Sequence, residues 1–311
     1  MKVRIGTRGS ALALAQAGSV AAALREVGAE VEIVSMRTEG DRRLSARLAE
    51  IGGKGLFVRE IEQALSDGRV DVAVHSLKDL PAETPDGLEL AAFPPREDPR
   101  DVLVARSDGG LGALPPGAVI GTSSLRRRAL ILAARPDLSV IPLRGNVDTR
   151  LAKLAAGECD GVILAAAGLR RLSLTPAHES ALDVETFVPA VGQGILVLEV
   201  RAGDAAVGEL VAGLNDPVTR TCALAERAYL GRLGASCNTP MAGHATLVGL
   251  ADRPRLLMTA LVASEDGRQV LRADSGGAPE DAEAIGRGLA ELMLERGAAE
   301  VTALEPSRGT R

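Results

Sequence analysis

Arginine is concentrated in one part of this sequence. Residues 121–150 contain six arginines and no lysine, against two aspartates. The planar guanidinium matches a carboxylate or phosphate group, so this bias predicts a site for an anion with several charges. Arg126 and Arg127 follow Gly-Thr-Ser-Ser at a predicted helix start, and Arg144 follows a predicted strand. The alternative is a solvated helix face, which fits Arg128 and Arg135 best.

A second chemical group stands at the end of another predicted strand, in the segment HSLKD at residues 75–79. The carboxylate of Asp79 beside the ammonium of Lys78 would stay ionised in a basic cleft, where it could stabilise a cation or transfer a proton. A surface ion pair between the two residues is the alternative. His75 is expected to be a structural histidine rather than a catalyst.

The third group is a cysteine in a loop of small residues, Cys237 in LGASCNTP. An exposed thiol of this kind can form a covalent bond. Cys222 lies within a helical pattern and Cys159 precedes a strand, so both are predicted to be packing residues. No pair of cysteines has zinc-ligand spacing, and no metal site is predicted. A hydrolase that uses Cys237 with His75 or His244 remains an alternative, although no triad motif supports it.

Two similar series of strands and helices would position these groups. Residues 2–7 predict a strand, 10–27 a helix with Ser10 as its N-cap, 30–38 a strand, a helix around 57–65 and a strand at 70–74. After the proline-rich segment 93–99, the series repeats as strand 118–122, helix 125–135, strand 138–143, helix 147–156 and strand 161–165. Alternating elements predict parallel sheets, in which ligands bind at the carboxyl ends of strands.

The pattern changes beyond residue 214. A helix is predicted from 217 to 230, then strands at 245–250, 256–263 and 269–273, and a final helix with Ile285, Leu289, Leu292 and Met293 on one face. These elements predict a third, smaller α+β domain.

Composition limits the classes of function. The chain has 311 residues, a net charge of −5, one Tyr, three Phe and no Trp, which disfavours a nucleic-acid binder. No uncharged run is long enough to span a bilayer, and the segment 9–24 fits a helix better than a secretory signal. Three cysteines in a chain of this length favour a reducing cytoplasm. Nothing indicates an obligate interface, so a monomer is expected.

Five motifs together resemble the porphobilinogen deaminase family, also called hydroxymethylbilane synthases. They are GGKGLF at 52–57, VHSLKD at 74–79, GTSSLRR at 121–127, LRGNV at 143–147 and PAVGQG at 189–194. They occur in the order and spacing of that family from near residue 1 to about residue 245, and the C-terminal part resembles it more loosely.

The resemblance implies an α/β fold with two lobes like those of periplasmic binding proteins around a cleft, plus a small C-terminal α+β domain. The implied domains are 1–95 with the return segment 194–214, 99–193, and 216–311. Enzymes of this family join four porphobilinogen molecules head to tail into hydroxymethylbilane and release ammonia. They start from a dipyrromethane cofactor held by a thioether to a loop cysteine. Because every pyrrole carries an acetate and a propionate, the growing chain is a polycarboxylate, which would explain the arginines.

The family's residue roles carry over to matching positions. Cys237 matches the cofactor-attachment residue, Asp79 matches the catalytic aspartate, and Lys54 and Phe57 lie in a stretch that forms a mobile loop in the family. The positions that match cofactor- and substrate-binding residues are Arg8, Ser10, Lys78, Thr122, Ser123, Ser124, Arg126, Arg127, Arg144, Asn146, Arg150, Arg171 and Gln193.

The departures from the family pattern are modest. Arg59 stands where lysine is common, Glu39 stands where arginine is frequent, and the cysteine loop reads GASC rather than the commoner GGC. The last difference could alter cofactor loading. A two-lobed protein that only binds an anion or solute remains the alternative, and it would need neither Asp79 nor a covalent Cys237.

Overall fold

The computed structural model describes residues 1–36, 58–234, 239–249 and 253–302. The chain forms two compact units. The first consists of Met1–Glu97 and Gly194–Arg220, and the second of Asp98–Gln193 and Thr221–Arg311. Helix α9 (Pro217–Leu233) begins in the first unit and continues in the second.

The first unit is built on a five-stranded sheet with the order β2-β1-β3-β10-β4. Strands β1 (Lys2–Arg8), β2 (Glu30–Met36) and β3 (Val72–Ser76) are parallel. Strand β10 (Leu196–Arg201) runs antiparallel to both β3 and β4 (Leu88–Ala92). The carboxyl ends of β1 and β3 therefore lie at the same edge of the sheet.

Helices cover both faces of this sheet. Apolar residues of α1 (Ala11–Glu26) and α8 (Ala205–Ala212) pack on one face, in a cluster that includes Val3, Ile5 and Val200. Helix α3 (Arg59–Ser66) packs on the other face through Ile61 and Leu65. Because side chains alternate along a strand, Ala73 and His75 of β3 point toward the face that α3 covers.

The second unit contains a sheet with the order β7-β6-β8-β5-β9. Strands β6 (Val119–Gly121), β7 (Ser139–Ile141) and β8 (Gly161–Ala165) are parallel. Strand β5 (Asp101–Ala105) is antiparallel to β8 and to β9 (Glu179–Ala181). The helices of this part are α4 (Gly110–Ala113), α5 (Leu125–Ala134), α6 (Val147–Ala155) and α7 (Ala166–Arg171).

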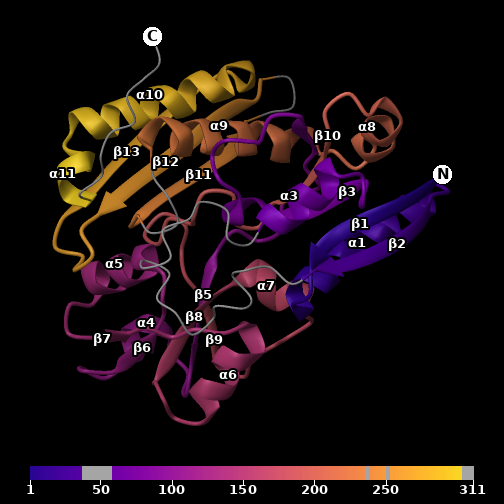
Figure 1. The fold of residues 1–311 in the computed structure, drawn as a ribbon. Helices are drawn as coiled ribbons and strands as arrows, with labels where there is room; N and C mark the ends of the chain where they lie inside the picture. Colours follow the sequence, from indigo (N-terminus) through magenta and orange to yellow (C-terminus); the bar gives the residue numbers. More distant parts are fainter. Residues whose placement is uncertain (37–57, 235–238, 250–252, 303–311) are drawn as a thin grey trace. The chain divides into compact units, whose positions relative to one another are not determined.

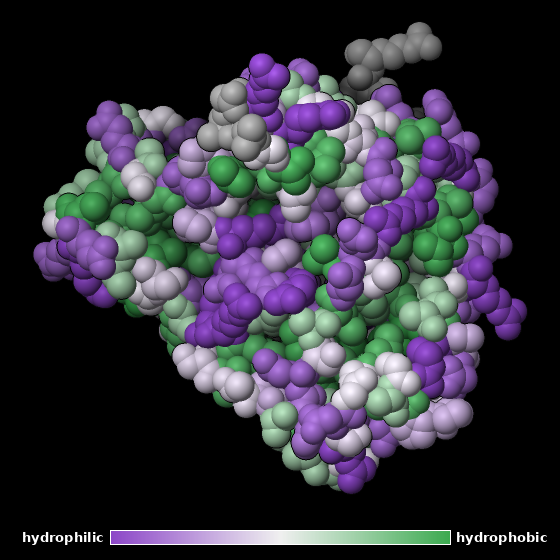
Figure 2. All heavy atoms as spheres, turned by 180° about the vertical axis from the view of Figure 1, so that it is seen from behind, coloured by the Kyte–Doolittle hydropathy of each residue, from purple (hydrophilic) through white to green (hydrophobic). Residues whose placement is uncertain are grey.

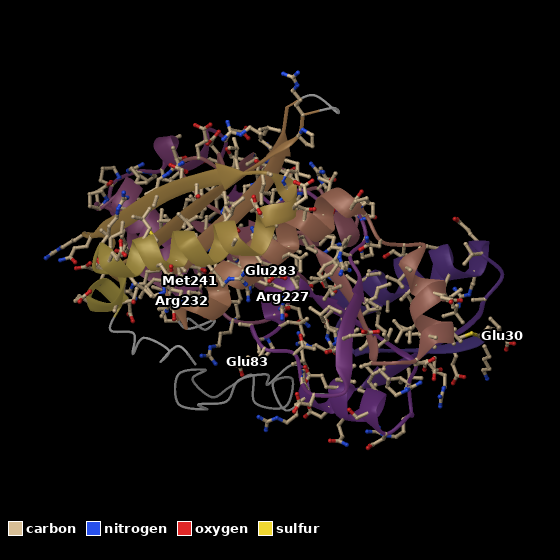
Figure 3. All side chains as sticks on the ribbon, turned by 90° about the horizontal axis from the view of Figure 1, so that it is seen from above. Glu30, Glu83, Arg227, Arg232, Met241 and Glu283 are labelled. Atoms are coloured by element: carbon tan, nitrogen blue, oxygen red, sulfur yellow. The ribbon has the colours of Figure 1, made fainter. Side chains whose placement is uncertain are left out.

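The second unit also contains an antiparallel three-stranded sheet of β11 (Met241–Val248), β12 (Arg255–Ala263) and β13 (Val270–Gly277). Helices α9 and α10 (Ala282–Glu295) cover one face of this sheet, and the short helix α11 (Ala298–Thr302) follows (Figure 1). Arg232 of α9, labelled in Figure 3, links the two helices, because its Nε donates to Oε1 of Glu291 in α10 at 3.2 Å. The predicted C-terminal α+β domain is confirmed.

The predicted series of elements is observed, with one correction. Ser10 caps α1 by accepting a hydrogen bond from the Ala13 amide, at 3.2 Å. Such a cap contributes about 1 kcal/mol to helix stability. The prediction of parallel sheets was wrong for part of each sheet, because β10 and β5 run antiparallel to their neighbours. The chain passes from the first unit to the second at Asp98 and returns to the first at Gly194. Strands β5 and β10 are the first strands after these two points, and each runs opposite to its neighbours in the sheet.

Large apolar side chains are mostly buried. In Figure 2, hydrophobic areas of the visible surface are interrupted by hydrophilic side chains. Among the described residues, no helix is long and apolar enough to cross a membrane.

Candidate active site

A pocket in the first unit contains Asp79 and lies where β1 and β3 end. Asp79 closes the short helix η1 (Leu77–Asp79), which follows β3 directly. The amide of Leu77 donates to the carbonyl of Ile195, at 3.0 Å, so the residue before β10 fixes the start of η1. The pocket, called the Asp79 pocket below, is lined by Arg8, Ser10, Leu12, Ala13, Gln16, Val58, Ile61, Val74, His75, Ser76 and Asp79.

Two side chains that line the Asp79 pocket, Gln16 and His75, are buried and form polar pairs. Gln16 of α1 donates through Nε2 to Ser76 Oγ at 2.9 Å. His75 Nε2 lies 3.1 Å from Glu199 Oε2, on the neighbouring strand β10. Both side chains of the second pair are almost fully buried, so the expectation of a hydrogen-bonded structural histidine describes this ring nitrogen correctly.

The second unit holds an arginine cluster, defined here as the buried Arg126 and Arg127, which contact Asp101, and the half-buried Arg150, whose charge interacts with that of Arg127. Asp101 begins β5 and is fully buried. Arg126 Nη2 donates to Asp101 Oδ2 at 2.7 Å, and Arg127 donates to Asp101 Oδ1 through Nε at 3.0 Å and Nη2 at 2.7 Å. The two guanidinium groups also donate to the backbone carbonyls of Val188 and Ile163.

Electrostatics in the arginine cluster are dominated by burial and by an excess of cations. Burial opposes ionisation of Asp101, but the charges of Arg126 and Arg127 outweigh it and lower the pKa of this carboxyl to about 2. Burial lowers the pKa of Arg126. Burial and the nearby charge of Arg127 lower the pKa of Arg150 to about 10. Within the described chain, Arg150 has no carboxylate partner, and its Nε donates to the Gly145 carbonyl at 2.8 Å.

The predicted hydroxyl ligands make local hydrogen bonds. Ser124 caps α5 by accepting from the amide of Arg127, at 3.4 Å. Thr122 Oγ1 accepts from the amide of Ser124 at 3.2 Å, and Ser123 Oγ donates to the Leu143 carbonyl at 3.0 Å. These bonds shape the turn that follows β6, and each hydroxyl oxygen keeps an unused lone pair.

Other predicted site residues occupy different places in the two units. Lys78 is half-buried within η1 and is not among the residues that line the Asp79 pocket. Arg144 is half-buried ahead of α6, Asn146 is exposed at the start of that helix, and Arg171 ends α7. Gln193 is buried, and its Nε2 donates to the carbonyl of Pro99 at 2.7 Å and to Asp101 Oδ1 at 3.1 Å.

Three predicted site residues, Lys54, Phe57 and Cys237, lie outside the described residues. Cys159 and Cys222 are buried, as expected for packing residues. Sequence reasoning missed the roles of Asp101 and Glu199. An acidic residue within or beside a run of apolar strand residues, as in DVLVA and LVLEV, is the local signal that could have identified both.

Comparison with known families and proteins identifies the relatives of this chain. Residues 3–209 match the family model "Porphobilinogen deaminase, dipyromethane cofactor binding domain", and residues 220–295 match the model of the C-terminal domain of the same enzymes. The chain belongs to the porphobilinogen deaminase family. The resemblance based on five motifs is therefore confirmed, and the solute-binding alternative gains no support.

Individual porphobilinogen deaminases are similar over nearly the whole chain. That of Syntrophobacter fumaroxidans is 49% identical over 95% of this chain and 95% of its own length. That of Chromobacterium violaceum is 50% identical over 96% of each chain. Among solved structures, a periplasmic binding protein of Salmonella typhimurium is 13% identical with a TM-score of 0.40, covering 70% of this chain and 93% of that one.

The buried arginines fit the carboxylates of a dipyrromethane group. This cofactor would bring acetate and propionate groups to the protein, and guanidinium groups bind carboxylates through paired hydrogen bonds. Arg126 and Arg127 share one carboxylate, and Arg150 has none among the described residues, so the surrounding protein does not balance their charge. A negatively charged ligand would restore the balance.

Proposed function

We propose that this chain is a porphobilinogen deaminase, a transferase that adds porphobilinogen units head to tail to form hydroxymethylbilane and releases ammonia. The observation that carries the proposal is the excess of cations in the arginine cluster, two of them buried and one half-buried. Arg126 and Arg127 share the carboxylate of Asp101, and burial together with Arg127 lowers the pKa of Arg150 to about 10. A buried cation without a counter-charge is unfavourable, so the cluster favours a ligand with several carboxylates.

The arginines bind the carboxylates of the cofactor and the growing chain in this proposal. The remaining N–H groups of Arg126 and Arg127 would take part, because Asp101 and the two backbone carbonyls use only some of their donors. Arg150 provides a further, half-buried guanidinium. The other proposed contacts come from Arg8, Ser10, Lys78, Thr122, Ser123, Ser124, Arg144, Asn146, Arg171 and Gln193, with Lys54 and Phe57 acting from their own segment.

Asp79 acts on the reacting pyrroles. Its carboxylate accepts hydrogen bonds from pyrrole N–H groups and stabilises the positive charge that develops when ammonia leaves. The half-buried position at the end of η1 supports this role, because a carboxylate that is partly removed from water interacts more strongly with a nearby cation.

The dipyrromethane cofactor is held by Cys237 in this proposal, and when bound it supplies the pyrrole carbon to which new units are joined. Cys237 follows α9 in the sequence, and its thiol would become the thioether sulfur. The other two cysteines are buried, which leaves them less accessible for such a reaction.

The intact mass of the freshly purified protein tests both the activity and the attachment residue. We expect the wild type to carry the added mass of two porphobilinogen units less two ammonias, and to colour with Ehrlich's reagent. Cys237→Ser should show only the polypeptide mass, while the matched variant Cys222→Ser should keep the added mass. A colourless wild type without added mass, even after incubation with porphobilinogen, would favour the anion-binding alternative.

Asp79→Ala tests the assignment of the catalytic carboxylate. Loss of an electrostatic or proton-transfer group should lower turnover by about 10²–10⁴-fold while the fold is retained. Asp86→Ala is the control, because Asp86 is exposed in the same connecting segment. Circular dichroism checks the fold and ammonia release measures turnover. A near-normal rate for Asp79→Ala would remove this residue from the mechanism.

We also infer that the enzyme acts as a monomer in the cytoplasm. Three cysteines in a chain of 311 residues are too few for a disulfide scaffold, which favours a reducing compartment. Sedimentation of the purified protein at micromolar concentration checks the oligomeric state, and a dimer would contradict the inference.

A further inference from the structure

The two ring nitrogens of His75 have different surroundings. Nε2 lies 3.1 Å from Glu199 Oε2, and the two side chains are only 3% and 1% exposed. Nδ1 has no hydrogen-bond partner among the described residues, although His75 lines the Asp79 pocket. A purely structural role accounts for Nε2 and leaves Nδ1 unexplained. This nitrogen is not among the fully buried atoms that lack a partner, so the pocket reaches it, and an accessible ring nitrogen at a pocket wall is available to a ligand.

Glu199 determines which nitrogen of His75 carries the proton. A carboxylate beside one ring nitrogen favours the N–H on that nitrogen, which leaves the lone pair on the other. Nδ1 is then a hydrogen-bond acceptor at the pocket wall. If Nδ1 takes a proton, the resulting imidazolium gains a favourable charge interaction with Glu199, as in other carboxylate–histidine pairs.

Further charges face His75 from the surrounding elements. Helix α3 contributes Glu62, whose pKa is raised by burial and by Glu199 and lowered in smaller part by His75 and Arg59. The other polar groups of the pocket near His75 are Arg8 of β1, Gln16 of α1, Ser76 of β3 and Asp79 of η1.

We propose that Nδ1 of His75 is a general base of the Asp79 pocket. It takes the proton that a pyrrole α-carbon loses after the new carbon–carbon bond has formed. The α C–H bond breaks, its electron pair returns to the pyrrole ring, and the proton moves to Nδ1. The ammonia released in the same turnover then removes this proton as ammonium. The proposal rests on the proposed function, and it divides the work so that Asp79 stabilises positive charge while His75 removes the proton.

His75→Gln tests the base, because glutamine can still donate to Glu199 but cannot accept a proton at neutral pH. We expect kcat to fall by about 10²-fold and KM to stay within about twofold, since general bases contribute about 10²–10⁴-fold. Porphobilinogen deuterated at its free α-carbon should react more slowly than the ordinary substrate with His75→Gln, and the isotope effect should exceed that of the wild type. A residue that only supports the fold would not change the isotope effect.

The matched control is His178→Gln, because His178 also pairs with a carboxylate, Asp108, but is exposed and outside the pocket. It should leave kcat unchanged. Intact mass and circular dichroism verify that each variant carries cofactor and is folded. A folded, loaded His75→Gln enzyme with kcat within about threefold of the wild type and an unchanged isotope effect overturns the proposal.

A measurement without turnover separates this proposal from the proposed function. The ¹⁵N shifts of labelled histidine in the wild-type holoenzyme should show the His75 proton on Nε2 and a lone pair on Nδ1. Glu199→Gln, which is isosteric, should weaken this preference and lower kcat by about tenfold. A proton on Nδ1 of the neutral wild-type ring overturns the base role even if turnover is normal. A wild type that releases no ammonia from porphobilinogen contradicts the proposed function, whatever the tautomer.

Discussion

Replacement of Asp101 by asparagine should destabilise the second unit strongly. Asp101 is fully buried and accepts hydrogen bonds from Arg126, Arg127 and Gln193. Asn has nearly the same size but no charge, so the variant leaves two buried guanidinium groups without their counter-ion. Removal of one partner from a buried ion pair typically costs about 3–5 kcal/mol, and we expect a loss in this range.

The pKa of Asp101 gives a second estimate of how much its charge contributes to the free energy of unfolding. The pKa of Asp101 is lowered from an ordinary value of 3.8 to about 2. Because the folded-state pKa is depressed, this carboxylate stabilises the protein above about pH 4, and the contribution is lost as the pH falls toward 2. The shift corresponds to about 2 kcal/mol, a smaller effect than that of the substitution. Asp101→Asn should lack this part of the acid destabilisation.

Urea unfolding monitored by near-ultraviolet circular dichroism measures both effects. The chain has one tyrosine and no tryptophan, and Tyr229 is fully buried in α9 of the second unit, so the tyrosine signal reports on that unit. Asp108→Asn is the control, since this carboxylate is 86% exposed and its pair with His178 should contribute less than about 1 kcal/mol. A loss below about 1 kcal/mol for Asp101→Asn would refute the view that Asp101 neutralises the arginine cluster.

Two further predictions concern the first unit. Gly194 has φ +87°, and a Cβ there would approach the Glu97 carbonyl oxygen too closely, so Gly194→Ala should lower the free energy of unfolding by about 1–3 kcal/mol. Gly18→Ala, in open space within α1, should instead raise it by about 0.5–1 kcal/mol, and equal melting temperatures for the two variants would contradict this reasoning. Burial and Glu199 raise the pKa of Glu62, so its ionised form is disfavoured in the folded protein and Glu62→Gln should be more stable than the wild type at pH 8. This gain in stability should disappear below the unfolded-state pKa of Glu62, where the wild-type carboxyl is protonated in both the folded and the unfolded state. Urea unfolding at pH 8 and pH 3 measures the difference between variant and wild type. A variant that is less stable than the wild type at pH 8 would contradict the prediction.

Local patterns were sufficient for most helices and for the parallel strands. The helix predicted at 125–135 is observed as Leu125–Ala134, and Ser124 provides the side-chain cap. The strand predicted at 161–165 has the bounds Gly161–Ala165. In both cases the signals that predict the element lie within a few neighbouring residues, because apolar periodicity and helix capping depend on local sequence.

The chemical partners could not be predicted in the same way. His75 and Glu199 are separated by 124 positions, and Asp101 is 25 positions from Arg126. Whether an arginine is solvated or paired in the interior depends on strand order and direction, and both antiparallel strands that carry these acids, β5 and β10, were missing from the predicted sheets. The sequence therefore indicated which residues were chemically important but not which carboxylates neutralised them.

The two five-stranded sheets have equivalent strand orders, but the side chains that surround their buried carboxylates differ. In each sheet the fourth strand is antiparallel and brings a buried carboxylate, Glu199 on β10 and Asp101 on β5. In the first unit this carboxylate lies beside a histidine, the side-chain type most often used for proton transfer. In the second unit it faces two arginines, which stay charged throughout the physiological range and can only bind anions. A reaction that moves protons on a substrate with many carboxylates needs both kinds of site. The same sheet arrangement provides both kinds of site, because the buried carboxylate is paired with histidine in the first unit and with arginine in the second.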